Sequence, residues 1–500
     1  MATMTDKAGP SASVERQRDR WTAISLLLLC WVLFAAFEQS PFKLQGAVLE
    51  ALVERGRLHF VHGNMSGIMF ENLDTKTLSF RFLFNIFPHE GRYYVNHAPG
   101  QFLLAAPWYA AFVKLGWRFE TNERLVWRLL VWLLTAPLGA LGIMCVFVLA
   151  RGWEVPWLPA LLTSLTLALC SPWWPASGVL YHDSLAIALG LVGIALWNCR
   201  FASNGIGSIV SPIAGGSLLA FAVVTSYLVA PIVVLIISFV LASRPSRRDL
   251  ALLGGGFLPT ISILPITNAI SFGSPFATGY SAGGFDKNYP SPFDLANAWE
   301  KMGFYLWHDE YGLLGLFPVF FFAAVGLLRS SALKPTVRKL LVALAGAHFL
   351  VIITMEHHGS VGWGMGRFFL PLYPLLIFGL PAFWDLPGWK GNTARALMFS
   401  SIVYSAAFAL AGVWYGVQGV MEPGVPTLKL RLSVEHYSSY RALVWVAIAG
   451  GVIGEFMYYY GLGSHHGSIQ RSSSPPLRQK ILQESKVGVP KSARKRRRKK

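Results

Sequence analysis

The sequence predicts an all-α polytopic membrane protein with about 12 transmembrane helices. Hydrophobic residues make up 54% of the 500 residues, charged residues make up only 14%, and the mean hydropathy is +0.46. So few charged side chains cannot cover the surface of a water-soluble protein of this length, which excludes the soluble globular class. Apolar runs recur from residue 21 to residue 460, and polar segments separate them.

The first apolar run covers residues 21–37 and follows a polar N-terminus at residues 1–20. No small-residue cleavage site follows the run, which indicates an uncleaved first span rather than a signal peptide. The N-terminus carries Lys7, Arg16 and further basic residues. It is therefore predicted to lie in the cytoplasm.

A long polar segment, residues 38–124, follows the first span and is predicted to form the first outer loop. Residues 44–56 in this loop form a helical stretch that ends in a glycine. Residues 101–115 are apolar but short for a span. We expect them to form an interfacial or re-entrant helix, with Trp108, Tyr109 and Trp117 at the depth of the lipid headgroups.

Loop charges decide how the later spans are oriented. These spans are predicted at residues 125–150, 157–172, 184–198, 209–224, 228–243, 250–270, 313–328, 340–355, 368–383, 394–414 and 442–460. If residues 101–115 do not cross the membrane, all the loops rich in Lys and Arg lie on the same side of the membrane as the two termini. The opposite short loops, 173–183, 225–227 and 357–366, contain no Lys or Arg. This asymmetry follows the positive-inside rule and places both termini in the cytoplasm.

The C-terminal tail, residues 462–500, holds most of the excess positive charge. After Gly467 it contains twelve Lys and Arg residues and one acidic residue, Glu484, in a chain with a net charge of +18. It lacks apolar periodicity and is predicted to be disordered. A basic segment after a last span is typical of an anchor on anionic lipids, so we expect this partner rather than nucleic acid.

Metal or disulfide chemistry is not indicated by the Cys and His spacing. The four Cys residues lie in or beside apolar runs, and two adjacent His pairs lack a third ligand at metal-binding spacing. These residues are Cys30, Cys145, Cys170, Cys199, His357, His358, His465 and His466. We therefore predict no metal and no cofactor.

The predicted topology gathers several polar residues at the outer membrane face. Ionisable groups at a membrane edge are costly, which makes them candidates for function. Glu38 ends the first span, His182 and Asp183 precede a later span, and Tyr227 separates two apolar segments. The remaining candidates are Asn96 and His97, before a Pro-Gly turn, and Arg367, after a Gly-rich loop.

Four stretches carry a family resemblance. They are GRYYVNHAPGQFLLAAPWYAAF (91–112), SPWWPASGVLYHDSLAIAL (171–189), FGSPFATGY (272–280) and GRFFLPLYPLL (366–376). In this order they resemble stretches of the GT-C class of membrane glycosyltransferases, which includes the protein O-mannosyltransferases and the aminoarabinose transferases of lipid A. The resemblance implies a GT-C type fold, with a catalytic transmembrane region at 21–383 and additional C-terminal helices at 384–461.

The resemblance also implies an activity. GT-C enzymes transfer a sugar from a polyprenyl-phosphate donor to an acceptor outside the membrane. An inverting transfer of this kind needs a base for the acceptor hydroxyl, and groups that hold the departing phosphate. The resemblance assigns Glu38 as the base, where relatives often have Asp, and Asp183 as a carboxylate at the sugar or acceptor. It assigns the substrate-binding residues His97 (where relatives often carry Lys), Arg367, Asn96, His182 and Tyr227.

Each main assignment has a plainer alternative. Glu38 can reach water from the end of its helix without a catalytic role. His97 can cap the helix that follows it, and Asp183 can be the N-cap of a helix that begins at Ser184. Arg367 can anchor its span at the membrane interface.

Two other functional classes remain open besides the glycosyltransferase. A transporter or lipid flippase predicts inverted repeats and broken helices with charged residues at mid-membrane, and neither is evident. The third class is a non-catalytic membrane scaffold with a GT-C fold. The sequence leaves open the sugar and the acceptor, which can be a protein, a lipid or a polysaccharide. The bacterial relatives favour a location in a bacterial inner membrane.

Overall fold

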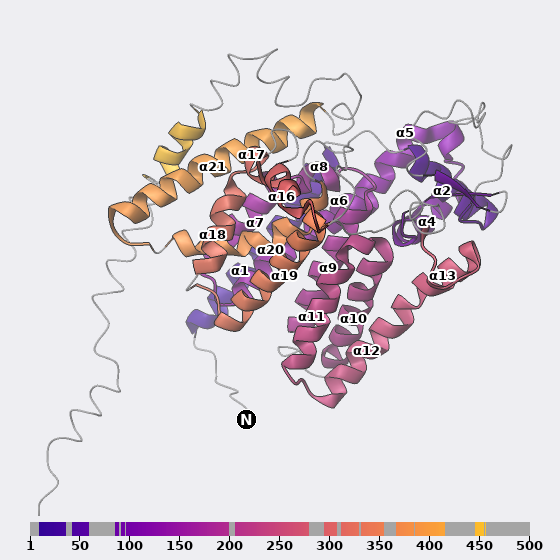
Figure 1. Cartoon of the computed structure of the whole chain (residues 1–500), viewed down its shortest axis with the longest axis horizontal. Coiled ribbons are helices and arrows are strands. Elements are labelled where there is room, and N and C mark those ends of the chain that lie inside the picture. Colours follow the sequence, from indigo (N-terminus) through magenta and orange to yellow (C-terminus); the bar gives the residue numbers. More distant parts are fainter. Residues whose placement is uncertain are drawn as a thin grey trace, which may run out of the picture.

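The computed structural model describes most of the chain. The described residues are 10–36, 43–59, 86–89, 92–95, 97–199, 206–279, 295–307, 312–329, 332–354, 367–384, 386–415, 446–454 and 456. Figure 1 shows a helical protein with steeply packed helices through its centre and a smaller group of elements at one end.

The elements of the first half are α1 (Pro10–Ala36), α2 (Lys43–Arg55), β1 (Ile86–His89), β2 (Arg92–Val95), α4 (Gly100–Lys114), α5 (Phe119–Leu130), η1 (Val131–Thr135), α6 (Ala136–Gly152), α7 (Trp157–Leu169), α8 (Trp173–Ser177), α9 (His182–Cys199) and α10 (Gly207–Thr225). Those of the second half are η2 (Tyr227–Val229), α11 (Ala230–Ala242), α12 (Arg247–Ile261), α13 (Ile263–Phe272), α16 (Ala298–Trp307), α17 (Leu313–Leu316), α18 (Val319–Arg329), α19 (Pro335–Thr354), η3 (Arg367–Phe369), α20 (Leu372–Leu376), η4 (Ile377–Phe383) and α21 (Gly388–Tyr415).

Six of the described helices are long and apolar enough to cross a membrane. They are Ser13–Ala36, Phe119–Gly152, Gly207–Thr225, Arg247–Phe272, Pro335–Thr354 and Gly388–Leu410. Five shorter apolar helices, Trp157–Leu169, His182–Asn198, Tyr227–Ala242, Val319–Arg329 and Leu372–Phe383, accompany them. Together they overlap every predicted span except the last, 442–460, of which the structure describes only residues 446–454 and 456. The protein is therefore an integral multi-pass membrane protein, and the total of about 12 spans remains a prediction.

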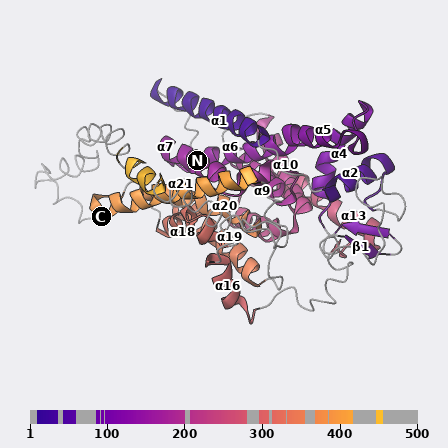
Figure 2. The ribbon, with the colours of Figure 1, turned by 90° about the horizontal axis from the view of Figure 1, so that it is seen from above.

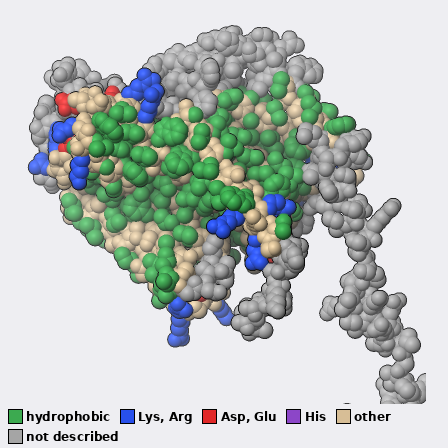
Figure 3. Space-filling view, turned by 180° about the vertical axis from the view of Figure 1, so that it is seen from behind, with side chains coloured by type: hydrophobic (Ala, Val, Ile, Leu, Met, Phe, Trp, Pro, Cys, Tyr) green, Lys and Arg blue, Asp and Glu red, His purple; other side chains and the backbone are tan. Residues whose placement is uncertain are grey.

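The surface agrees with a lipid environment. Figure 3 shows a broad hydrophobic face with Lys and Arg side chains toward its margins. Large apolar side chains are exposed on several helices, including Val32, Val234, Leu258 and Ile270. A soluble monomer rarely exposes so much apolar surface.

The helical class is confirmed, and the first loop contains one short hairpin that the sequence analysis did not predict. β1 and β2 form an antiparallel pair in which Ile86 faces Val95 and His89 faces Arg92. The stretch from 86 to 95 contains Phe, Tyr, Val and Ile, residue types that favour a pleated strand. The search for helical segments in this loop therefore missed a short hairpin.

The first loop also contains its own hydrophobic cluster. This cluster joins α2, α4 and α5 and reaches Leu180 and Leu185 beside α9. The predicted helix at 44–56 is observed as α2, and Gly56 follows it with a φ of 65°. The predicted short helix at 101–115 is observed as α4, and Figure 2 shows it with α2 and α13 at one end of the molecule.

The two aromatic residues of α4 differ in exposure, and their depth in the membrane stays a prediction. The Tyr109 side chain is fully buried within the protein, whereas that of Trp108 is exposed. The Tyr109 hydroxyl donates to Glu54 Oε1 at 2.8 Å, and Glu54 Oε2 lies 3.3 Å from Arg118 Nη1. Successive helical residues face in different directions, so the two aromatic residues cannot share one environment.

The two ends of helices α1 and α6 differ in the residues that they carry. At one end of α1 and α6, Arg151 binds Asp19 and Glu15, each at 2.8 Å. At the other end of the same two helices, Gly139 lies in close contact with Ser177 and near Phe34. α8 and the start of α9 are at this second end, which carries the predicted site residues. Along these two helices Arg151 and the predicted site residues therefore lie at opposite ends, and the sidedness of the other loops stays a prediction.

Candidate functional site

The structure describes the side chains of four predicted site residues: His97, His182, Asp183 and Tyr227. Arg367 begins η3, but only its backbone is described. Glu38 and Asn96 lie outside the described residues, so their roles stay predictions.

Asp183 is a buried carboxylate with two side-chain partners. The Tyr181 hydroxyl donates to its Oδ2 at 2.8 Å, and the Ser226 hydroxyl donates to its Oδ1 at 2.6 Å. The side chain is almost fully buried. α9 begins at His182, so Asp183 lies in the first helical turn and not at an N-cap before Ser184. A carboxylate is favourable in this turn because the helix N-terminus carries partial positive charge.

The Ser226 bond joins two helices that are distant in the sequence. α10 ends at Thr225, Ser226 is extended with φ −148° and ψ 123°, and η2 begins at Tyr227. This interruption of the apolar run is the one expected from the sequence. It frees the Ser226 side chain to reach across to the start of α9.

Two histidines lie next to the carboxylate. The His97 and His182 rings have centroids 4.5 Å apart, with 37° between their planes. His182 Nε2 lies 3.5 Å from Asp183 Oδ1. A protonated His182 would therefore be attracted to the carboxylate, and each imidazole can donate or accept according to its tautomer.

Gly100 determines where His97 can lie. A methyl group on Gly100 would be 2.7 Å from the backbone N and Cα of Thr225 and would also overlap with its hydroxyl. Only glycine allows so close an approach of two backbones. The Pro-Gly turn of the 91–112 stretch therefore packs directly on the end of α10, which brings His97 toward Tyr227.

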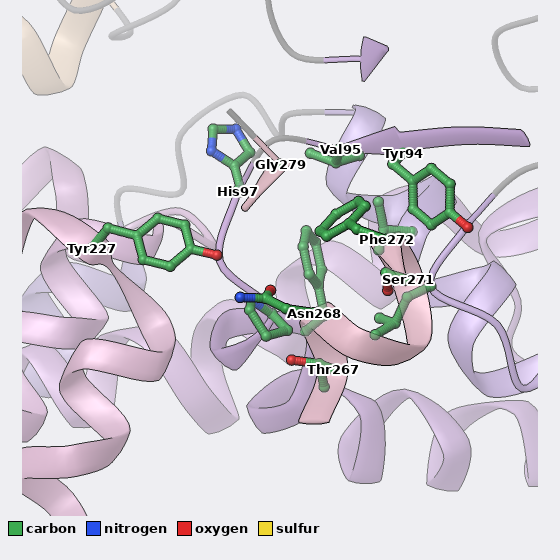
Figure 4. A pocket seen from close by; sticks show the side chains of 13 residues that line it. Tyr94, Val95, His97, Tyr227, Thr267, Asn268, Ser271, Phe272 and Gly279 are labelled. Carbon is green, nitrogen blue, oxygen red and sulfur yellow. The ribbon is translucent and has the colours of Figure 1, made fainter. Parts of the chain in front are cut away.

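A small cavity opens beside this turn. It measures about 30 Å³ and is lined by His97, Tyr227, Asn268 and Thr267, with Tyr94 and Phe272 on an apolar side. Figure 4 shows the Tyr227 hydroxyl and the Asn268 amide pointing into the same part of it, with His97 close by. Small-molecule sites usually measure roughly 300–1,000 Å³. This cavity is therefore large enough for a water molecule or a hydroxyl group and too small for a whole sugar.

α16, α19 and η3 pack against one another and contain a buried histidine and a buried lysine. His348 of α19 is fully buried, and its Nε2 lies 3.0 Å from the Phe368 carbonyl oxygen. Lys301 of α16 is fully buried one helical turn before Tyr305. The Tyr305 ring meets the Phe369 ring edge-on at 5.7 Å, which places α16 against η3.

Sequence reasoning missed several of these residues. His348 is the only ionisable residue in the predicted span 340–355, a signal that could have identified it. Lys301 gave a weaker signal, because a single Lys in an amphipathic loop helix is usually exposed. Asn268 and Tyr181 gave none, because their importance comes from the residues that they face.

The site contains no metal centre within the described ranges. No three His, Cys, Asp or Glu side chains there lie close enough together to hold an ion. The predicted His pairs at 357–358 and 465–466 lie outside those ranges.

No family model matches the sequence, and no curated protein matches it either. The structure is similar to two solved structures of ArnT from Cupriavidus metallidurans. The structure bound to undecaprenyl phosphate gives a TM-score of 0.46 at 13% identity, and the apo structure gives 0.44 at 14%. Each comparison covers 87% of this chain and 75% of ArnT. The similarity to an aminoarabinose transferase that the sequence predicted is thus observed. It concerns the general course of the chain, and the site is argued from its contacts alone.

Proposed function

We propose that this protein is a membrane glycosyltransferase that transfers a sugar from a polyprenyl-phosphate donor to an acceptor hydroxyl. The observation that carries the proposal is the buried Asp183 carboxylate, held by Tyr181 and Ser226 beside His182 and His97. Three of the four family-like stretches contribute directly to this constellation or to the cavity beside it. The proposal is that the transfer inverts the anomeric carbon and takes place on the outer face.

Asp183 supports this function through its remaining acceptor capacity. A carboxylate can accept about four hydrogen bonds, and the two hydroxyl partners hold it in one orientation. We propose that Asp183 accepts hydrogen bonds from hydroxyl groups of the sugar or of the acceptor. His182 and Tyr227 contribute further polar contacts, and His97 with Asn96 lies on the side of the donor phosphate.

Glu38 and Arg367 complete the proposed mechanism. Glu38 removes the proton of the acceptor hydroxyl as that oxygen attacks the anomeric carbon, and the bond from that carbon to the phosphate breaks. The polyprenyl phosphate leaves as an anion. Arg367 stabilises it because a guanidinium can bind a phosphate with two parallel hydrogen bonds.

The membrane arrangement is part of the same proposal. Both termini lie in the cytoplasm, the site faces the opposite compartment, and the tail at 462–500 lies on anionic lipids. The membrane is proposed to be the inner membrane of a bacterium. Labelling of single introduced Cys residues with a membrane-impermeant reagent tests the orientation, because a tail labelled from outside would reverse it.

The activity test uses the purified protein in lipid nanodiscs with a panel of radiolabelled polyprenyl-phosphate sugars. Release of free polyprenyl phosphate is measured for wild type, Glu38→Gln and Asp183→Asn. Glu154→Gln is the matched control, because Glu154 pairs with Lys334 at 2.8 Å and its side chain is largely exposed.

The two site variants are expected to fail for different reasons. Loss of the base lowers kcat about 10²–10⁴-fold. In Asp183→Asn the new amide nitrogen donates where the carboxylate accepts, so one hydroxyl partner is lost and substrate affinity falls about tenfold. Full transfer by Glu38→Gln would refute the base assignment. Transport of a lipid or solute without any sugar release would replace the proposal with the transporter alternative.

A further inference from the structure

His348 makes a contact that the proposed mechanism does not yet use. It lies in α19, is fully buried, and its Nε2 is 3.0 Å from the Phe368 carbonyl oxygen. A carbonyl oxygen only accepts, so Nε2 carries the hydrogen and donates it. The bond therefore connects α19 to η3 at the residue that directly follows Arg367.

Aromatic packing holds the rest of η3. The fully buried Phe369 ring lies edge-on to Tyr305 at 5.7 Å and stacks on Phe349 at 6.4 Å. Such contacts depend weakly on direction, so they allow η3 to slide or turn by a small amount. A hydrogen bond depends on distance and angle. The His348 bond therefore adds the directional restraint that the rings do not supply.

Packing alone does not account for a histidine at this position. Neighbouring residues of α19 are apolar, and Nδ1 is buried with no hydrogen-bond partner among the described residues. Burial of such a group opposes folding, and leucine would fill the space without this cost. The hydrogen bond to the Phe368 carbonyl oxygen is therefore the contact that accounts for a histidine at this position.

We propose that His348 is a positioning residue, which fixes the backbone of η3 next to Arg367 by holding the Phe368 carbonyl oxygen. The inference rests on the proposed function, because the phosphate role of Arg367 belongs to that function. Without the bond, η3 shifts and the guanidinium no longer meets the donor phosphate in its optimal position. Loss of the His348 bond is therefore expected to weaken binding of the donor more than it slows proton removal by Glu38.

Two amide variants separate this role from a general need for a polar side chain. The amide nitrogen of Gln lies as many bonds from the backbone as Nε2 of His, whereas that of Asn corresponds to Nδ1. His348→Gln therefore keeps the donor within reach of Phe368, and His348→Asn does not. If the Asn variant fails to fold, His348→Met replaces it, because Met has a similar length and no donor.

The first measurement does not depend on any activity. Hydrogen–deuterium exchange of a peptide covering residues 367–372 is expected to be faster in His348→Asn and unchanged in His348→Gln. Equal exchange in both variants overturns the inference, whatever the protein does.

The second measurement uses transfer kinetics in the nanodisc assay. We expect an about tenfold higher KM for the donor in His348→Asn, equivalent to one hydrogen bond, with kcat changed less and with near wild-type values in His348→Gln. In an Arg367→Gln background, the Asn substitution is expected to add little, because both changes remove the same contact.

Each outcome has a distinct meaning. Equal KM values in the Gln and Asn variants, or effects that multiply in the Arg367→Gln background, overturn the positioning role. Lack of donor binding and transfer by wild type refutes the proposed function, and the positioning role with it. In that case the exchange data still show whether His348 restrains η3.

Discussion

Substitution of Gly100 by alanine tests the geometry of the candidate site most directly. Gly100 begins α4 and packs against the last residue of α10. A methyl group there would lie 2.7 Å from the backbone N and Cα of Thr225. A side-chain rotation cannot remove backbone atoms from this space, so the turn before α4 must move away from α10.

The size of the movement follows from the contact distance. Carbon atoms rest at about 3.5–4.0 Å, so relief of this contact requires a shift of about 1 Å. Overpacking of this kind costs about 1–3 kcal/mol, of which the better helix propensity of Ala recovers up to about 1 kcal/mol. His97 belongs to the same turn, and its ring centroid lies 4.5 Å from that of His182. A shift of the turn therefore changes the packing of the two imidazole rings. A misplacement of about 1 Å at a reacting centre can lower the rate about 100-fold.

The assay compares thermal unfolding and donor turnover of Gly100→Ala with those of wild type. Gly346→Ala is the matched control, because a methyl group on Gly346 in α19 meets no atom of the described residues within 4 Å outside its own helix backbone. We expect a lower melting temperature and an about 100-fold lower rate for Gly100→Ala only. A Gly100→Ala protein with the stability and the turnover of wild type would refute the close approach of the turn to α10.

Two further predictions concern the ends of the molecule. Burial, followed by the hydrogen bond to Glu54, raises the pKa of Tyr109. The folded protein therefore holds this proton more tightly than the unfolded chain, and stability falls as the pH rises above the usual pKa of 10.0. Thermal melts at alkaline pH should show a smaller loss for Tyr109→Phe, and identical pH profiles would contradict this. Arg151→Met removes the ion pairs with Asp19 and Glu15 and should cost about 1–2 kcal/mol. Donor KM should stay at its wild-type value, since this end lies away from the site, and a raised KM would contradict that placement.

Helix positions were largely predictable because they depend on local composition. A helix that crosses the hydrocarbon core needs a long, mainly apolar segment, and such segments are visible in a sequence. The break near Tyr227 was visible for the same reason, because polar residues 225–227 interrupt an apolar run. The short helix α4 was distinguished from a span by its length and by the charges of the loops around it.

The partners of Asp183 were not predictable in the same way. The sequence marked Asp183 as a carboxylate before a span, which is equally consistent with an N-cap. Ser226 is 43 positions away, and its bond to Asp183 depends on how α9 and α10 cross. The hairpin at 86–95 was missed for a different reason, since it is short and lies in a loop where helices were sought.

The sequence by itself determined a multi-pass helical protein, the positions of its basic loops and polar candidate residues along the chain, and the order of the family-like stretches. These properties follow from hydrophobic length and charge, which each segment carries alone. Only the tertiary structure decided that Asp183 is held by Tyr181 and Ser226, and that His348 binds the carbonyl of Phe368. Contacts between distant segments depend on helix packing, and packing is set by side-chain shape across two surfaces at once.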